Sequence, residues 1–252
     1  MNSVTEMRRR LDRVAFARSL GIEPDAWQID ALRSQAHRQA YNASRQSGKS
    51  TVAAIRSVHC ALYEPGALVL LLSPTLRQSG ELFRKCLAFY RAAGRPVEPS
   101  SETALTLTLD NGSRIVSLPG HEATVRGYSA VRLLVIDEAS RVSDLLYASV
   151  RPMLAVSQGR LVTLSTPFGM RGWWYEAWRS PEEEWERFEV PATEIARISA
   201  SFLQEEKMAL PRRIYRQEYE CSFEATEDQV FSLEDVDRAI SDDIAPLFEV
   251  AS

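Results

Sequence analysis

Cysteine is scarce in this chain, with only Cys60, Cys86 and Cys221 among 252 residues. Because the three are odd in number and far apart, a disulfide framework is excluded, and we expect reduced thiols that serve as packing residues. Histidine is equally rare, and the three histidines share no ligand spacing with the cysteines. A zinc site is therefore not expected.

Long apolar runs are also missing. No run approaches the roughly 20 apolar residues that a helix needs to cross a bilayer, and the Arg-rich residues 7–13 precede no apolar core of the signal-peptide kind. We therefore expect a protein of the cytoplasm without a membrane partner. A strong excess of one charge is lacking too. A net charge of −4 argues against a protein that coats nucleic acid along its whole surface, but it does not exclude a local strip of basic residues.

What the chain does contain is a phosphate-binding pattern in residues 41–50, Tyr-Asn-Ala-Ser-Arg-Gln-Ser-Gly-Lys-Ser, between a predicted strand and an amphipathic helix. In such a loop Gly48 lets the backbone approach a polyphosphate, Lys49 reaches the β and γ oxygens, and the Ser50 hydroxyl ligates magnesium. The pattern has a further glycine where this chain has Ala43. Taken alone, the motif could also be a surface turn.

A second motif is the apolar run 133–139, Leu-Leu-Val-Ile-Asp-Glu-Ala. A strand that is buried on both faces of a parallel sheet has this composition. Its carboxyl end is expected beside the phosphate loop, where Asp137 would help to hold magnesium and Glu138 would orient or deprotonate the attacking water. The alternative for Glu138 is an acidic residue that stabilises the start of the next helix.

The rest of the chain alternates between strand and helix patterns, which predicts a mostly parallel sheet with right-handed crossovers. The expected helices are 4–20, 26–36 after an Asp25 N-cap, 52–62, 78–92 and 144–156 with a kink at Pro152, and the expected strands are 38–42, 67–72, 103–109, 114–118, 133–136 and 160–165. The Asn-Gly at 111–112 predicts a hairpin between two of these strands.

We expect three regions: an N-terminal helical segment at 1–36 packing on the core, the core at 37–198, and a small helical lid at 199–252. Two short helices separated by Pro211 and a further helix over 232–240 would form the lid. Tryptophans 173, 174, 178 and 185 are interpreted as core packing rather than base stacking. Trp27-Gln28 has two interpretations: a glutamine bonded to an adenine edge, or a core tryptophan beside a surface glutamine.

Taken together, these motifs resemble the large terminase subunit of tailed bacteriophages over nearly the whole chain. The matching segments, in order, are Trp27-Gln28, 44–50, Ser73-Pro74-Thr75 with Gln78-Ser79, Val125-Arg126-Gly127, 136–139 and Leu164-Ser165-Thr166-Pro167. A phosphate loop without its first glycine is typical of that family. The resemblance implies an α/β fold of the RecA-like, ASCE-type P-loop NTPases, in which a ring of subunits on a viral portal pumps double-stranded DNA into a capsid.

The resemblance also implies ATP and Mg²⁺ as cofactors and assigns residues to them. Gln28 would contact the adenine, Ser50 and Asp137 would hold magnesium, and Glu138 would activate water. Ser165 and Thr166 would be the motif that reports the state of the γ-phosphate. The full set of residues in contact with the nucleotide would be Gln28, Ser44, Arg45, Gln46, Ser47, Gly48, Lys49, Ser50, Ser165 and Thr166. The catalytic arginine stays open between Arg126, offered to a neighbouring subunit, and Arg45, acting in cis. Either arginine could instead be a surface ion-pair residue.

The implied partners are double-stranded DNA, the portal, the small terminase subunit and further copies of the chain in a ring, a pentamer by resemblance, with a monomer expected in isolation. The implied location is the cytoplasm of the infected bacterial host, with transient docking on the procapsid. Family members continue into a nuclease domain, whereas this sequence stops at Ser252. We therefore expect no nuclease activity from it, since its charge runs are typical of solvated faces.

Two alternatives share these motifs. The first is the first RecA-like lobe of a DNA or RNA helicase, which would need a second lobe from elsewhere. The second is a catalytically silent nucleotide-binding module of an assembly.

Overall fold

One sheet organises the part of the chain that the computed structural model describes, which is residues 3–120, 125, 127–180 and 184–225. Eight strands lie in the order β3-β4-β5-β2-β6-β7-β1-β8. They are β1 Arg38–Ala43, β2 Leu68–Ser73, β3 Pro99–Glu102, β4 Thr106–Leu109, β5 Arg114–Pro119, β6 Val131–Asp137, β7 Arg160–Ser165 and β8 Trp185–Val190. All neighbours from β5 to β8 pair in parallel, and only β3-β4 and β4-β5 are antiparallel. The predicted mostly parallel α/β fold is confirmed.

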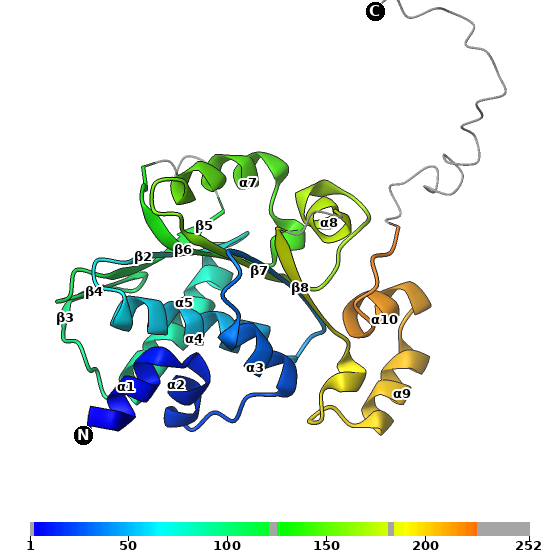
Figure 1. Cartoon of the computed structure of the whole chain (residues 1–252). Coiled ribbons are helices and arrows are strands. Elements are labelled where there is room, and N and C mark those ends of the chain that lie inside the picture. Colours follow the sequence, from blue (N-terminus) through cyan, green and yellow to red (C-terminus); the bar gives the residue numbers. More distant parts are fainter. Residues whose placement is uncertain (1–2, 121–124, 126, 181–183, 226–252) are drawn as a thin grey trace, which may run out of the picture.

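Helices cover both faces of the sheet (Figure 1). The helices on one face are α1 Ser3–Leu11, α2 Arg13–Ser19, α3 Ala26–Arg33, α4 Lys49–Tyr63 and α5 Leu76–Ala92, and those on the other are α7 Asp144–Val150 and α8 Gly172–Arg179. Short 3₁₀ turns lie at Ala139–Arg141 (η1), Arg151–Leu154 (η2) and Ala192–Glu194 (η3). At the β8 edge, α9 Ala200–Ala209 and α10 Arg212–Tyr219 form the helical C-terminal part of the described chain.

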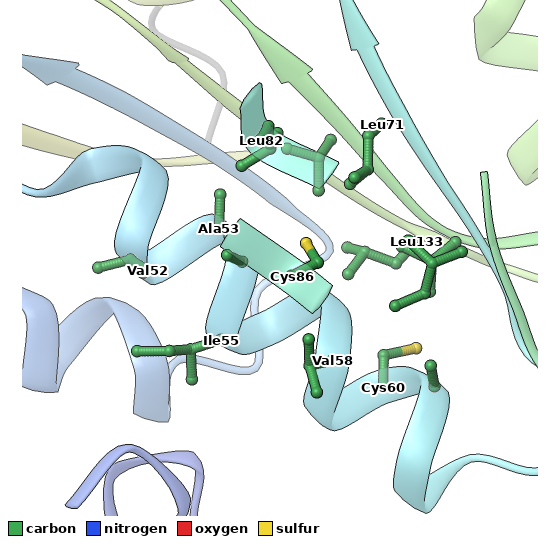
Figure 2. Close-up of a cluster of buried hydrophobic side chains, with 14 of the residues drawn as sticks. Val52, Ala53, Ile55, Val58, Cys60, Leu71, Leu82, Cys86 and Leu133 are labelled. Carbon is green, nitrogen blue, oxygen red and sulfur yellow. The ribbon is translucent and has the colours of Figure 1, made fainter. Parts of the chain in front are cut away.

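Strand alternation divides the interior into two cores. In β2, Val69 and Leu71 pack against α4 and α5, whereas Leu70 and Leu72 face α7 and α8, because successive side chains of a strand point to opposite faces. Figure 2 shows the first core, where residues of α4 meet Leu71 and other apolar side chains. Truncating a buried leucine such as Leu71 to alanine would cost about 2–5 kcal/mol.

Several boundaries differ from the predictions. The single helix expected over 4–20 is wrong, because Asp12 accepts a hydrogen bond from the Val14 N–H at 2.9 Å and begins a new helix there. The helix expected over 26–36 ends at Arg33. Strands β3 and β8 were not predicted, because their short half-buried sequences lack a clear alternation of apolar residues. The hairpin, the break at Pro152 and the two short helices around Pro211 are confirmed.

Buried packing residues agree with the sequence analysis. Cys60, Cys86 and Cys221 are free and buried, and burial raises the pKa of each thiol to about 12. Trp173, Trp174 and Trp185 belong to the second core. Within the described residues, no helix combines the length and apolar character needed to cross a membrane. The helix predicted over 232–240 lies outside those residues, and the proposed three-part division of the chain stays a prediction.

Candidate functional site

The two sequence motifs meet at one edge of the sheet. Strands β1 and β6 are both parallel to β7, which lies between them, so the loop after β1 and the acidic pair after β6 leave the sheet at the same edge. A cavity of about 550 Å³ lies there, and its walls include Gly48, Lys49, Ser50 and Glu138. The crevice at the carboxyl ends of the strands is where open α/β sheets bind ligands.

The loop itself is shaped by residues in the left-handed backbone region. Gln46 has a φ of 64° and Gly48, which begins α4, has a φ of 86°. Such alternation is typical of the backbone concavities that bind anions, although the N–H groups of Arg45 and Ser47 donate to Glu218 O and Ser44 O here. Glycine is required at 48 for a second reason, since a Cβ there would lie 2.4 Å from Gln28 Nε2. The α4 N-terminus adds its dipole to the same concavity.

Lys49 is buried beneath this loop. Its Nζ donates hydrogen bonds to Ala43 O at 3.1 Å and Ser44 O at 3.4 Å. Burial lowers the pKa of Lys49, while the nearby carboxylates of Glu138 and Asp137 oppose that change. The Lys49 ammonium therefore donates to neutral carbonyl oxygens. Phosphate oxygens, which are charged, would be stronger acceptors for the same donor.

The two carboxylates of the acidic pair lie in different surroundings, because Asp137 is buried and Glu138 is at the cavity wall. Asp137 is 8% exposed, and burial together with the charge of Glu138 raises its pKa to about 6. Asp137 Oδ1 accepts the Glu138 N–H at 2.9 Å. Glu138 has a φ of 52°, a left-handed turn that carries its side chain to the cavity wall and leaves Asp137 at the tip of the strand.

The oxygens of Ser50 and Asp137 are the hard donors that Mg²⁺ prefers. Within the described residues, no cluster of three or more His, Cys, Asp or Glu side chains is placed to hold a metal ion. A magnesium ion bound here would therefore complete its coordination with phosphate oxygens and water, which is the usual arrangement for this ion. The residues present fit such a metal–nucleotide complex.

Ser165 and Thr166 lie at the end of β7, between the loop and the acidic pair, and both are buried. Ser165 Oγ lies 2.7 Å from Ser140 Oγ and accepts the Ser140 N–H at 3.3 Å. Since Ser140 is two residues beyond Glu138, a displacement at the end of β7 has a direct path to the acidic segment. The sequence analysis did not identify Ser140.

Gln28 is buried rather than on the surface, with an exposed fraction of 5%. Its Oε1 accepts the Asp25 N–H at 3.0 Å, and its Nε2 donates to Ser47 O at 3.2 Å. The amide keeps one free donor and one lone pair for a ligand in the cavity that it lines. Trp27 packs edge-on against Tyr41, with ring centroids 5.8 Å apart, as the core interpretation of that residue predicts.

Of the two candidate arginines, only Arg45 lies within the described residues. Arg45 lines the cavity, but its side chain pairs with Glu218 of α10, and its N–H donates to Glu218 O at 3.3 Å. Arg126 lies outside the described residues. Ser44 and Ser47, the remaining predicted loop residues, are both buried, and their hydroxyls have no hydrogen-bond partner within the described chain.

Sequence reasoning missed two cations of the cavity wall, Lys85 of α5 and Arg197 of the loop before α9. Lys85 Nζ lies 3.4 Å from Thr51 Oγ1. Its position beside the apolar face of a predicted helix was a weak signal. Arg197 gave none, because it is 150 residues from the loop that it contacts.

Comparison with known proteins agrees with this geometry. Residues 40–238 match the protein-family model described as terminase large subunit, T4likevirus-type, N-terminal. The terminase large subunit of Thermus virus P23-45 is 26% identical, with 86% of this chain and 52% of that protein covered. The chain thus spans about half the length of the curated relatives that it matches.

Solved structures similar in fold include the following two. The ATPase domain of the Thermus phage P74-26 large terminase superposes with a TM-score of 0.75 at 24% identity, covering 83% of this chain and 97% of that one. The large terminase of a thermophilic bacteriophage, in complex with ADP, superposes with a TM-score of 0.62 at 12% identity, covering 82% and 52%.

Proposed function

Since the chain belongs to the family of T4-type terminase large subunits, in their N-terminal part, we propose that it is the ATP-hydrolysing motor domain of a DNA-packaging terminase. The observation that carries the proposal is the shared cavity of Lys49 and Glu138, with β7 between β1 and β6, the strands that precede these two residues. In phosphoryl transfer, most of the catalysis comes from positioning and from stabilisation of charge. A phosphate loop facing a carboxylate supplies both.

In this proposal the loop N–H groups and Lys49 hold the β- and γ-phosphates of ATP. Ser50 and Asp137 would hold Mg²⁺, which would neutralise charge on the phosphates. Glu138 accepts a hydrogen bond from the attacking water and takes its proton as the water oxygen bonds to the γ-phosphorus. The bond from that phosphorus to the bridging oxygen breaks at the same time, so that ADP leaves with the bridging oxygen and the γ-phosphoryl group becomes inorganic phosphate. Gln28, which lines the cavity beside the loop, offers its remaining amide donor and lone pair to the base.

Ser165 and Thr166 transmit the state of the γ-phosphate in the proposed cycle. They lie between the two motifs, and the Ser165–Ser140 contact joins β7 to the acidic segment. Loss of the γ-phosphate would shift this contact and with it the position of Glu138. That is the step at which hydrolysis is coupled to movement of double-stranded DNA.

The proposed setting is a viral one. The chain would act as one subunit of a homo-oligomeric ring, a pentamer, on a portal in the infected bacterial cytoplasm, with the small terminase subunit as a further partner. The family match favours this function over the first lobe of a helicase, which shares the loop and the acidic strand.

Substitution at the acidic pair tests the proposal. Glu138→Gln should retain ATP binding and lose at least about 10²-fold in kcat, since general-base catalysis contributes about 10²–10⁴-fold. Glu205→Gln on the exposed face of α9 is the matched control and should hydrolyse ATP at the wild-type rate. Equal turnover by the wild-type and Glu138→Gln chains would instead indicate a catalytically silent nucleotide-binding module.

A mixing experiment addresses the catalytic arginine. If Arg126 acts on a neighbouring subunit, a mixture of Arg126→Ala and Glu138→Gln chains should regain turnover, because each chain supplies what its neighbour lacks. Wild-type turnover per subunit should then rise with protein concentration. No recovery at any ratio, with turnover independent of concentration, would favour Arg45 in cis.

A further inference from the structure

Arg197 makes more contacts to the phosphate loop than a surface arginine requires. It lies between η3 and α9, and its guanidinium donates from Nε and Nη2 to Gln46 O, at 3.3 and 3.1 Å, and from Nη2 to Ser47 O at 2.7 Å. Its Nη1 pairs with Asp25 Oδ2 at 2.7 Å. One side chain thus contacts two consecutive loop carbonyls and the start of α3.

These contacts close into a ring with Gln28. Ser47 O accepts from Gln28 Nε2 as well as from Arg197, and Gln28 Oε1 accepts the N–H of Asp25, the residue that pairs with Arg197. Three segments that are far apart in the sequence, at 25–28, 46–47 and 197, are therefore joined by one set of polar contacts. None of the segments can move alone without breaking a charged or buried hydrogen bond.

The direction of the two carbonyls decides where the loop N–H groups point. In a planar trans peptide, the C=O and the following N–H point in opposite directions. Because Gln46 O and Ser47 O face the guanidinium, the N–H groups of Ser47 and Gly48 are directed away from it. Gly48 is the N-cap of α4, beside Lys49, so its N–H belongs to the helix N-terminus, the part of a helix that binds phosphate.

The loop needs such support because part of it is strained. Gln46 has a φ of 64°, in a region that side chains other than glycine rarely adopt and that persists only where surrounding contacts impose it. Arg197 bonds to the carbonyl of this same residue. Without that contact, Gln46 could relax and turn the peptide that joins it to Ser47, and the conformation of the loop before Gly48 would change.

We infer that Arg197 is a positioning residue for nucleotide binding, which holds the phosphate loop in its binding conformation before the nucleotide arrives. The inference rests on the proposed nucleotide-binding function. Arg197 acts through the carbonyls of Gln46 and Ser47, and its own charge is largely balanced by Asp25. Lysine cannot reproduce this role, because only the planar guanidinium directs several donors along fixed directions at once.

The test compares nucleotide affinity and turnover in matched variants. Arg197→Ala should weaken the binding of ATP and ADP alike by about 10- to 100-fold, the equivalent of one or two charge-assisted hydrogen bonds, and should change kcat at saturation by less than about threefold. Arg197→Lys should recover only part of the affinity. Arg212→Ala, an exposed arginine at the start of α10, should bind as the wild type does.

Two further measurements separate the positioning role from other roles. Inorganic tripolyphosphate, used as a competitor, should lose affinity for Arg197→Ala by the same factor as ATP, because the defect is in the phosphate loop. Asp25→Asn should weaken binding in the same direction, and its effect should be less than additive with Arg197→Ala, since both residues support one network. Thermal unfolding of each variant checks that the fold is retained.

The outcomes that would contradict the role of Arg197 differ from those that would contradict the proposed ATPase. An Arg197→Ala affinity within twofold of the wild type, a fall in kcat without a change in affinity, unchanged tripolyphosphate binding, or additivity with Asp25→Asn would each overturn the inference. A wild-type chain that binds nucleotide without hydrolysing it would contradict the proposed ATPase alone, since the affinity comparison needs only binding. A wild-type chain that binds no nucleotide would overturn both.

Discussion

Arg45 Nε lies 2.5 Å from Glu218 Oε2, in an ion pair that joins the phosphate-binding loop to α10. Glu218 is the more buried partner, with 12% of its side chain exposed against 66% for Arg45. The backbone repeats the connection, because the Arg45 N–H donates to Glu218 O and Asn42 Nδ2 donates to Cys221 O at 2.8 Å. In this state the guanidinium is directed at the C-terminal helices rather than at a phosphate.

This pairing gives a prediction about the catalytic arginine. If Arg45 acts in cis, Arg45→Ala should lower kcat by about 10³-fold or more. Glu218→Ala should raise kcat by up to about fivefold, because an ion pair with a solvent-exposed guanidinium is worth about 0–1 kcal/mol and its loss frees that guanidinium. Single-turnover ATP hydrolysis measures both. Unchanged rates in both variants would mean that the pair only attaches α10 to the loop.

Lys85 is predicted to contribute to nucleotide affinity. Its ammonium lines the cavity and contacts Thr51 Oγ1, and no ion pair with a carboxylate is found for it among the residues that the structure describes. Lys85→Ala should raise the KM for ATP about fivefold, through the loss of roughly 1 kcal/mol of attraction to the phosphates. Arg84→Ala is the control, since Arg84 pairs with Glu81 on the exposed face of α5. Equal KM values for the two variants would contradict a role for Lys85.

Gly48→Ala should abolish tight nucleotide binding. The new Cβ would meet Gln28 Nε2 and would occupy a left-handed backbone position, so the Gln28 amide would have to leave its contact with Ser47 O and the loop would be strained. We expect affinity to fall by more than about 30-fold, the equivalent of about 2 kcal/mol. Gly94→Ala has a similar φ of 82° with open space around the new atom. It should lower the free energy of unfolding by about 1 kcal/mol and leave nucleotide titrations unchanged.

His59 predicts a pH dependence of stability. Burial and the charge of Arg13 lower its pKa to about 4, against about 6.5 in an unfolded chain. Below pH 6.5 the unfolded chain binds a proton that the folded chain does not, so this contribution is complete above pH 6.5 and is lost as the pH falls toward 4. The shift corresponds to about 3 kcal/mol.

Urea unfolding at a series of pH values tests the role of His59. Between pH 6.5 and 4, His59→Gln should lose less stability than the wild type, because the glutamine does not titrate. His37→Gln, at an exposed position, should follow the wild-type curve. Parallel curves for all three proteins would show that His59 carries no linked proton.

The parts of the site that could be predicted from the sequence are short motifs. In each motif the functional residues are adjacent in the chain to the residues that form the strand end or the turn. Gly48 and Lys49 stand at a strand-to-helix turn, and Asp137 and Glu138 end an apolar run, so the periodicity alone places both motifs at strand ends. Their meeting in one cavity followed from parallel strand topology.

What could not be predicted depends on tertiary contacts. Arg197 is an ordinary loop residue until β8 brings it against Gln46, and β8 itself has a half-buried pattern that does not alternate clearly. Gln28 was ambiguous because its burial is decided by Ser47, which lies 19 residues away along the chain. The break at Asp12 was missed because the apolar periodicity continues across it, while the cap depends on a single side chain.

The place of β7 in the strand order has a mechanical consequence. Neighbouring strands are about 4.8 Å apart, so the ends of β1 and β6, with one strand between them, are held about 10 Å apart. That span is fixed by ladder hydrogen bonds on both sides of β7. Substitutions can change which side chains lie between the ends of β1 and β6. The distance between these ends can change only if a whole strand shifts its register or leaves the sheet. The distance between the ends of β1 and β6 is therefore fixed. A nucleotide that is one phosphate shorter would leave part of it unfilled.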